Sequence, residues 1–466
     1  MRIGTHSNRL GWLPLGGVAG IGVAVQIAAY WPGIMIWDAI RQYGQAISGR
    51  FDDWHPPAFE WLWRQLLPIH DGPAPMLILQ LILYWTGFLV LAGWARRHGR
   101  NRLAIAIMLA ALLPIPFALI GAVLKDSLMA GLLLTATGLL AWHQDSGKRP
   151  VQLIAMFLLL FAATLRFNAF VAGLPLLVAL LPARWRSSPA RLMLTAIIAA
   201  IPLFLAVPVA NKLLRAEHSG VELSLVIFDL GGITYHSGID AFPPQPVVDP
   251  VAINRACYAP DKWDRYAWWG PDPCPIGFET VRAALEQHHQ SPYGYWIGAI
   301  LAHPIAYAQH RLSHFNRSSY FLIHGDIPPP AFRHSDPNIW NEQVRPNVVL
   351  TTVDDIAAWS TRTPIGWPIW WMALAAGVPI LSPALPTRRL IVPVALSALL
   401  YGLGYLVVGV ASEMRYHLWT MTGALLATII AASDFLSGAC SPRARLICAA
   451  GPVMLVTTLA AGWRLL

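Results

Sequence analysis

Ionisable side chains gather in residues 37–57, which have the sequence WDAIRQYGQAISGRFDDWHPP and follow a long apolar run. Asp38, Asp52, Asp53 and His55 lie in this stretch. A carboxylate can take a proton from a substrate, and carboxylates with an imidazole can also ligate a metal ion. Simpler roles remain open. Asp38 can pair with Arg41, the two adjacent aspartates can cap a turn or helix, and His55 can be an ordinary loop residue.

Three further segments carry charges next to apolar runs. Positive charge there can meet a phosphate group, and ionisable residues near membrane depth are costly enough to indicate function. The alternatives are that Lys125 and Arg166 extend toward the membrane surface, and that Glu413 pairs internally with Arg415. The segments are GAVLKDSLMAG with Lys125 and Asp126, ATLRFNAF with Arg166 and Asn168, and ASEMRYH with Glu413, Arg415 and Tyr416.

The composition indicates a membrane protein with many spans. Of the 466 residues, 56% are hydrophobic and 12% are charged, which is about half the charged fraction of ordinary soluble domains. We therefore expect an all-α polytopic membrane protein with about eleven transmembrane helices. The expected spans are residues 12–31, 74–94, 103–121, 125–142, 151–165, 169–182, 192–210, 365–383, 390–410, 416–433 and 446–463.

Basic loops orient these spans, because Lys and Arg in short loops mark the cytoplasmic side. Arg2 and Arg9 precede the first span, and every second loop is basic. We expect a cytoplasmic N-terminus, a first span retained as an anchor and a location in the bacterial inner membrane. The net charge of +9 then reflects topology rather than nucleic-acid binding. The basic loops are ARRHGRNR, HQDSGKRP, ARWRSSPAR, TRR and SPRAR.

The expected organisation has three parts. Residues 1–210 form a seven-span module whose first outer loop is 32–73, residues 211–364 form an extracytoplasmic loop domain, and residues 365–466 form a four-span module. In the first outer loop, apolar and aromatic residues at helical spacing predict an amphipathic helix that carries Asp38 and lies on the membrane surface. A second helix is expected after the His-Pro-Pro sequence.

The loop domain gives weaker signals. Residues 221–233 are expected to begin a helix or a strand, and the Gly-Gly pair within them to form a turn. Residues 295–322 predict one or two helices broken at Pro304, with a polar face suited to the membrane surface. That face contains His303, His310, Arg311, His314 and Arg317. A disulfide between Cys257 and Cys274 is open, as are two free thiols.

The first outer loop resembles that of GT-C glycosyltransferases. The pattern is an acidic residue soon after the first span, a helix, acidic-x-His-Pro-Pro and another helix. It is most similar to the protein O-mannosyltransferase-like branch and to related bacterial membrane transferases. The resemblance covers roughly residues 1–210, and the rest matches only in layout. The chain departs at Ala39, where the mannosyltransferases have a second acidic residue, which leaves the acceptor class open.

The resemblance implies a hexosyl- or pentosyltransferase. It would move a sugar from a polyprenyl-phosphate-linked donor to a hydroxyl acceptor on the extracytoplasmic, periplasmic face, with Asp38 as the general base. The acceptor can be a lipid, a glycan or a protein, and membrane lipids are further partners. The expected contacts of the donor phosphate are Lys125, Arg166 and Arg415. The residues expected to bind acceptor or shape the site are Asp52, Asp53 and His55.

No cofactor is firmly expected, and a divalent cation remains open. The sequence has no P-loop and no dinucleotide-binding glycine motif, so nucleotide-driven chemistry is unsupported. A secondary transporter or lipid flippase is an alternative, although the span centres are nearly free of charge. A polysaccharide ligase or polymerase is another, which would rely on His310, Arg311 and His314. A non-enzymatic assembly factor is a third.

Overall fold

The computed structural model describes residues 13–269, 272–324 and 328–465, which form helices, loops and isolated bridges without a regular strand. The chain divides into two compact units. The first comprises Met1–Glu217, Asp326–Gly402 and Arg415–Thr457, and the second His218–Gly325, Leu403–Met414 and Thr458–Leu466. The expected three-part organisation concerns membrane sidedness and stays a prediction. Arg2 and Arg9 lie outside the described residues.

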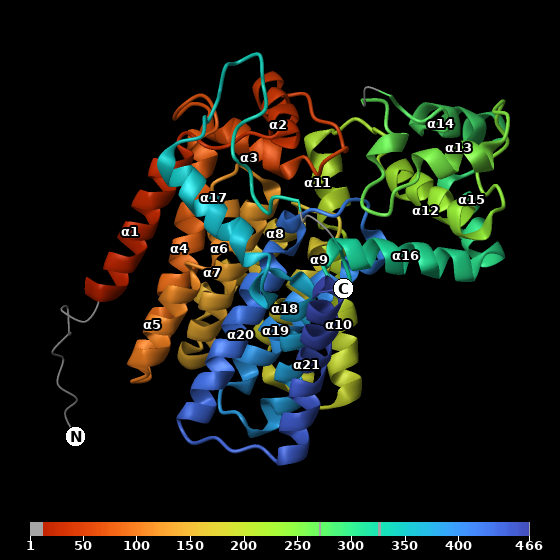
Figure 1. The fold of residues 1–466 in the computed structure, drawn as a ribbon. Helices are drawn as coiled ribbons and strands as arrows, with labels where there is room; N and C mark the ends of the chain where they lie inside the picture. Colours follow the sequence, from red (N-terminus) through yellow and green to blue (C-terminus); the bar gives the residue numbers. More distant parts are fainter. Residues whose placement is uncertain (1–12, 270–271, 325–327, 466) are drawn as a thin grey trace, which may run out of the picture. The chain divides into compact units, whose positions relative to one another are not determined.

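The first unit holds most of the helices, and α19 and α21 end in the second unit (Figure 1). Short 3-10 turns join several of them, including Ala183–Arg186 and Met414–His417. The helices are α1 (Leu13–Tyr30), α2 (Trp37–Ser48), α3 (Ala58–Leu66), α4 (Ala74–Arg97), α5 (Asn101–Ala110), α6 (Pro114–Leu119), α7 (Lys125–Ser146), α8 (Arg149–Ala163), α9 (Ala169–Leu180), α10 (Pro189–Phe204), α11 (Ala206–Leu214), α17 (Val348–Ser360), α18 (Pro368–Leu381), α19 (Arg388–Val408), α20 (Leu418–Leu436) and α21 (Arg443–Leu465).

Among the described residues, five helical segments are long and apolar enough to cross a membrane. They are Ala74–Arg97, Pro189–Leu214, Arg388–Val408, Met414–Leu436 and Arg443–Leu465. Other predicted spans are helical but shorter, so the number of eleven and the orientation stay predictions. The predicted span 103–121 is divided into α5 and α6, because Pro114 has no N–H to continue the first helix.

The second unit contains α12 (Glu222–Ser237), α13 (Pro250–Cys257), α14 (Phe278–Gln287), α15 (Pro292–Ala302) and α16 (Pro304–Ser318). Helix α12 contacts each of the other four, as Figure 1 shows for the green helices. A disulfide joins Cys257 to Cys274. The break expected at Pro304 is present between α15 and α16.

Two expectations about this unit are wrong. The Gly-Gly pair lies inside α12 rather than in a turn. Bulky groups pack against the helix at this point, and only glycine leaves room for them. A Cβ on Gly231 would lie 2.4 Å from the Tyr266 hydroxyl, and one on Gly232 would lie 2.1 Å from the His310 ring. The polar face of α16 is not wholly directed to a membrane surface either. His310 Nε2 lies 3.0 Å from the buried Asp229 carboxylate, and Arg311 Nη2 lies 2.5 Å from it.

Candidate active site

Four ionisable side chains of the first unit converge on one point. The Asp38 carboxylate lies 2.9 Å from Arg415 Nη1 and 3.7 Å from Lys125 Nζ. Its other oxygen lies 3.7 Å from His55 Nε2. The four residues come from α2, the loop before α3, the start of α7 and the turn before α20. Arg415 and Lys125 are buried, whereas the Asp38 side chain keeps 23% of its surface exposed.

Backbone pairing between distant segments brings Asp38 to Lys125. Ile34 forms a parallel bridge with Ala122, just before the helices α2 and α7 begin. Val123 N–H donates to the Ile34 carbonyl at 2.9 Å. Apolar side chains on both sides, including Ile34 and Leu124, belong to one buried cluster that also includes Leu350 of α17. The two helix starts are therefore fixed side by side, and each presents its charged residue within its first turn.

A loop from far along the chain caps α2. The Asp336 carboxylate accepts a hydrogen bond of 2.8 Å from the Trp37 N–H, and Asp336 N–H donates to the Met35 carbonyl at 2.9 Å. The first N–H groups of a helix have no partner within the helix, so a carboxylate from outside stabilises its start. This capping fixes the first turn of α2, on which Asp38 stands.

The charges around Asp38 set the protonation of the site. Burial alone would raise the pKa of the Asp38 carboxyl, but the adjacent Arg415, Lys125 and His55 hold it well below its usual range. Burial and the Lys125 ammonium lower the pKa of His55 to about 4. Lys125 Nζ lies 2.8 Å from His55 Nδ1, and an ammonium has only donors, so Nδ1 accepts and Nε2 carries the proton. At neutral pH the site therefore holds an ionised Asp38 and a neutral His55.

Arg166 belongs to the same region. It pairs with the buried Asp126 carboxylate, next to Lys125 in sequence. The Tyr416 ring lies close to two cations, with the guanidinium carbon 4.4 Å from the ring centroid for Arg166 and 5.3 Å for Arg415. Tyr416 thus links Arg166 to the cluster through its π face.

The site has an excess of positive charge. Lys125, Arg166 and Arg415 are three cations, and Asp38 and Asp126 are two carboxylates, so this group carries one net positive charge. Such a group can accept an anion such as a phosphate, while Asp38 can accept a proton from a hydroxyl.

The other acidic residues of the first outer loop have different partners. Arg41 pairs with Asp52 at 2.5 Å, so the alternative pair of Arg41 with Asp38 is not formed. Asp52 also accepts from Gln45 Nε2 at 2.9 Å and from Trp54 N–H at 3.0 Å, which ties the turn to α2. The Asp53 N–H donates to a backbone carbonyl of residue 217 at 3.0 Å. Asp52 therefore holds the loop, and His55 is the member of this set that reaches Asp38.

Metal ligation by Asp52, Asp53 and His55 is not favoured by this arrangement. Across the described ranges, no group of three His, Cys, Asp or Glu residues is arranged to hold a metal ion. Asp52 is directed to Arg41 and Gln45, and His55 to Lys125. A divalent ion at Asp38 would also have to share the carboxylate with two buried cations, which charge repulsion disfavours.

No protein-family model matches the sequence, and no curated protein matches it. Solved structures of two kinds are similar in fold. The oligosaccharyltransferase of Archaeoglobus fulgidus, tethered with an acceptor peptide, gives a TM-score of 0.40 at 13% identity, over 98% of this chain and 55% of that one. The chain thus spans about half the length of that protein. The archaeal oligosaccharyltransferase AglB from Archaeoglobus fulgidus, in complex with an inhibitory peptide and a dolichol-phosphate, gives a TM-score of 0.40 at 12% identity, over 98% of this chain and 56% of that one.

ArnT from Cupriavidus metallidurans, bound to undecaprenyl phosphate, gives a TM-score of 0.34 at 14% identity, over 92% of this chain and 78% of that one. At such scores the similarity carries no argument about activity. The chemistry has to be inferred from the arrangement of side chains around Asp38.

Sequence reasoning missed two buried polar residues beside the site. Gln80 of α4 donates through Nε2 to the Ala122 carbonyl at 3.0 Å and accepts from Leu124 N–H at 3.0 Å, so it holds the turn that precedes Lys125. Glu60 of α3 accepts from Gln42 Nε2 at 2.9 Å, and burial raises the pKa of Glu60 to about 8. A single Gln within an apolar run was the available signal for Gln80. Nothing local distinguished Glu60 from an exposed helical glutamate.

Proposed function

We propose that this chain is a membrane glycosyltransferase of GT-C type, which transfers a hexose or pentose from a polyprenyl-phosphate-linked donor to a hydroxyl acceptor at the extracytoplasmic membrane surface. The single observation that carries the proposal is the convergence of Asp38, Lys125 and Arg415 from three distant segments. The resemblance of the first outer loop to that of GT-C enzymes supports the same reaction. The basic loops support the outer location.

In the proposed chemistry, the Asp38 carboxylate and the cations of the cluster have different roles. The acceptor hydroxyl attacks the anomeric carbon of the donor, and its proton passes to the Asp38 carboxylate as the new glycosidic bond forms. The bond from the anomeric carbon to the phosphate oxygen breaks, and the polyprenyl phosphate leaves with one more negative charge than it had in the donor. Lys125 and Arg415 stabilise this charge, and Arg166 adds to the positive field behind them.

The low pKa of Asp38 in the free protein has a consequence for this mechanism. A carboxylate held by two cations is ionised but weakly basic. When the donor phosphate shares Arg415 and Lys125, it draws positive charge away from Asp38 and raises the pKa of that carboxyl. Donor binding would therefore make Asp38 a stronger base at the moment when the acceptor proton must be taken.

The test is transfer from a panel of polyprenyl-phosphate sugars by the purified, folded protein in nanodiscs. We expect Asp38→Asn to lower the rate at least about 100-fold, within the range attributed to a general base. The matched control is Asp71→Asn, which changes the same chemical group at an exposed position of the same outer loop. Lys125→Gln should raise the donor KM and also lower kcat, because Lys125 meets the phosphate both in the donor and as it leaves.

Full activity in Asp38→Asn would remove Asp38 from the role of base. If no donor of the panel is a substrate of the wild-type protein but it binds a polyprenyl diphosphate-linked glycan, a ligase becomes the better assignment. The ligase alternative has less support from geometry, because His310 and His314 are fully buried and Arg311 nearly so.

A further inference from the structure

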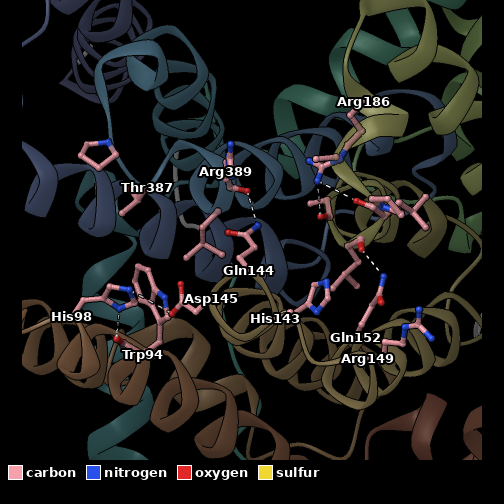
Figure 2. A pocket seen from close by; sticks show the side chains of 18 of the residues that line it. Trp94, His98, His143, Gln144, Asp145, Arg149, Gln152, Arg186, Thr387 and Arg389 are labelled. Carbon is pink, nitrogen blue, oxygen red and sulfur yellow. Dashed lines mark hydrogen bonds and ion pairs between the residues drawn. The ribbon is translucent and has the colours of Figure 1, made fainter. Parts of the chain in front are cut away.

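A second polar site lies at the opposite end of α7 from Lys125. A cavity of about 860 Å³ opens there, at the height of His143 and Asp145 in the last turns of this helix. A helix of 22 residues rises about 33 Å, so the cavity is separated from Asp38 by roughly the thickness of a bilayer core. It is lined by four of the basic loops (Figure 2).

The lining is strongly basic. It contains Arg100, Arg149, Arg186 and Arg389, two histidines and a single acidic residue, Asp145. Arg100 is neutralised by Asp434 at 2.5 Å. Asp145 lies 3.5 Å from a histidine ring of the same lining. Within the part of the chain that the structure describes, the other three arginines pair with no carboxylate.

Arg186 is held in place without a counter-ion. Its Nη2 donates to the carbonyls of Ala179 and Leu181, at 3.2 and 3.1 Å. Its Nε is buried and has no hydrogen-bond partner. Burial and the charge of Arg389 lower the pKa of Arg186. In Figure 2, Arg186 and Arg389 lie above the pocket, and His143 and Gln152 lie below it. Two arginines that line one cavity without a carboxylate partner favour the binding of an anion there.

The surroundings favour a lipid over a free ion. Helix α8 begins at the cavity with Arg149 and Gln152, and its next turns expose Leu153, Ile154 and Phe157 by 53 to 64%. Trp185, next to Arg186, is also 44% exposed, as is typical of aromatic residues at a membrane interface. An apolar surface therefore continues directly from the charged pocket, as the acyl chains of a lipid require.

We propose that this pocket binds the phosphate-bearing headgroup of an anionic membrane phospholipid, with the acyl chains along α8. Arg186 and Arg389 would contact the phosphate, because a guanidinium can donate two parallel hydrogen bonds to phosphate oxygens. Basic pockets between membrane helices on the cytoplasmic side are suited to such headgroups. The proposal does not depend on the proposed sugar transfer.

The test measures retention of phosphatidylglycerol by native mass spectrometry, with the full chain in phosphatidylcholine nanodiscs that contain phosphatidylglycerol. The double variant Arg186→Gln/Arg389→Gln should lower the affinity about thirtyfold, and Arg389→Gln alone about fivefold. Arg184→Gln/Arg388→Gln is the matched control, because it removes the same charge from the neighbouring residues, which do not line the cavity. This control should change affinity less than about twofold.

Equal losses in the two double variants would overturn the proposal, since they would indicate general attraction to the anionic surface. Equal retention of phosphatidylcholine and phosphatidylglycerol by the wild-type protein would also overturn it. Inorganic phosphate and glycerol phosphate form the soluble arm. If either competes as well as the lipid does, the site takes a free phosphate and the lipid assignment is wrong. Thermal unfolding of each variant verifies that it is folded.

Discussion

Replacing Asp38 by Asn should slow transfer at least about 100-fold and, at the same time, tighten the binding of polyprenyl phosphate. In the free protein the carboxylate already occupies both cations that we assign to the phosphate, at 2.9 Å from Arg415 and 3.7 Å from Lys125. A phosphate that binds there has to weaken these two ion pairs. In Asp38→Asn the cations are released from the carboxylate, and the cluster has a larger excess of positive charge.

The magnitude follows from the two distances. At an effective dielectric constant of about 20, each pair has a gross Coulomb energy between about 4 and 6 kcal/mol. The Asp38 side chain is 23% exposed, and hydration of the released cations offsets most of this attraction. We expect a net gain of about 2 kcal/mol for the phosphate, which corresponds to about thirtyfold tighter binding.

The assay compares the dissociation constants of undecaprenyl phosphate and of uncharged undecaprenol for wild-type protein and Asp38→Asn in nanodiscs. Asp71→Asn is again the control, and the gain should appear for the phosphate only. The gain should also shrink as salt is added. Unchanged or weaker phosphate binding in folded Asp38→Asn would refute the reasoning, because it would mean that Asp38 and the phosphate do not share their cations.

Three further predictions concern the surroundings of the site. Because the pKa of Glu60 is raised to about 8, its contribution to stability is complete below about pH 4.5 and is lost as pH rises to about 8. Measured by thermal unfolding, the stability of wild type relative to Glu60→Gln should therefore fall by an amount on the order of 5 kcal/mol across this range, whereas the stability of wild type relative to the exposed control Glu286→Gln should stay constant. Gln80→Leu should cost about 2–4 kcal/mol in the same measurement and slow transfer, since it leaves buried backbone groups unpaired, whereas Gln65→Leu on an exposed face should do neither. Tyr416→Leu should raise the donor KM about tenfold with a smaller effect on kcat, because it removes the ring that both guanidinium groups contact; an unchanged KM would contradict this.

Local patterns were sufficient for much of the secondary structure. The helical spacing after the first apolar run predicted α2, and the proline rule predicted α3 and the break between α15 and α16. These signals depend on residues that are close together along the chain, so they can be recognised in the sequence alone. The Gly-Gly pair was wrongly predicted to form a turn, because the residues that pack against it are distant in sequence. Small residues there allow the close approach of Tyr266 and His310, rather than ending the helix.

The partners of individual charges were harder to predict. Arg41 is near Asp38 in sequence and on the same helix, yet it pairs with Asp52 across the loop. The charged face of α16 could be seen in the sequence, but its direction toward Asp229 could not. Which opposite charge a side chain meets depends on which elements pack together, and a long side chain can reach several candidates.

The sequence by itself determined that this chain has many apolar helices, that basic segments follow several of its apolar runs and that a carboxylate stands at the start of a helix after the first apolar run. Only the tertiary structure decided that Lys125 and Arg415 meet this carboxylate, while Arg166 stands behind them with Asp126 and Tyr416. Hydropathy and helical period are properties of neighbouring residues. The charge cluster is produced by the pairing of residue 34 with residue 122 and by burial among segments hundreds of residues apart, as the 299-residue separation of Trp37 and Asp336 illustrates.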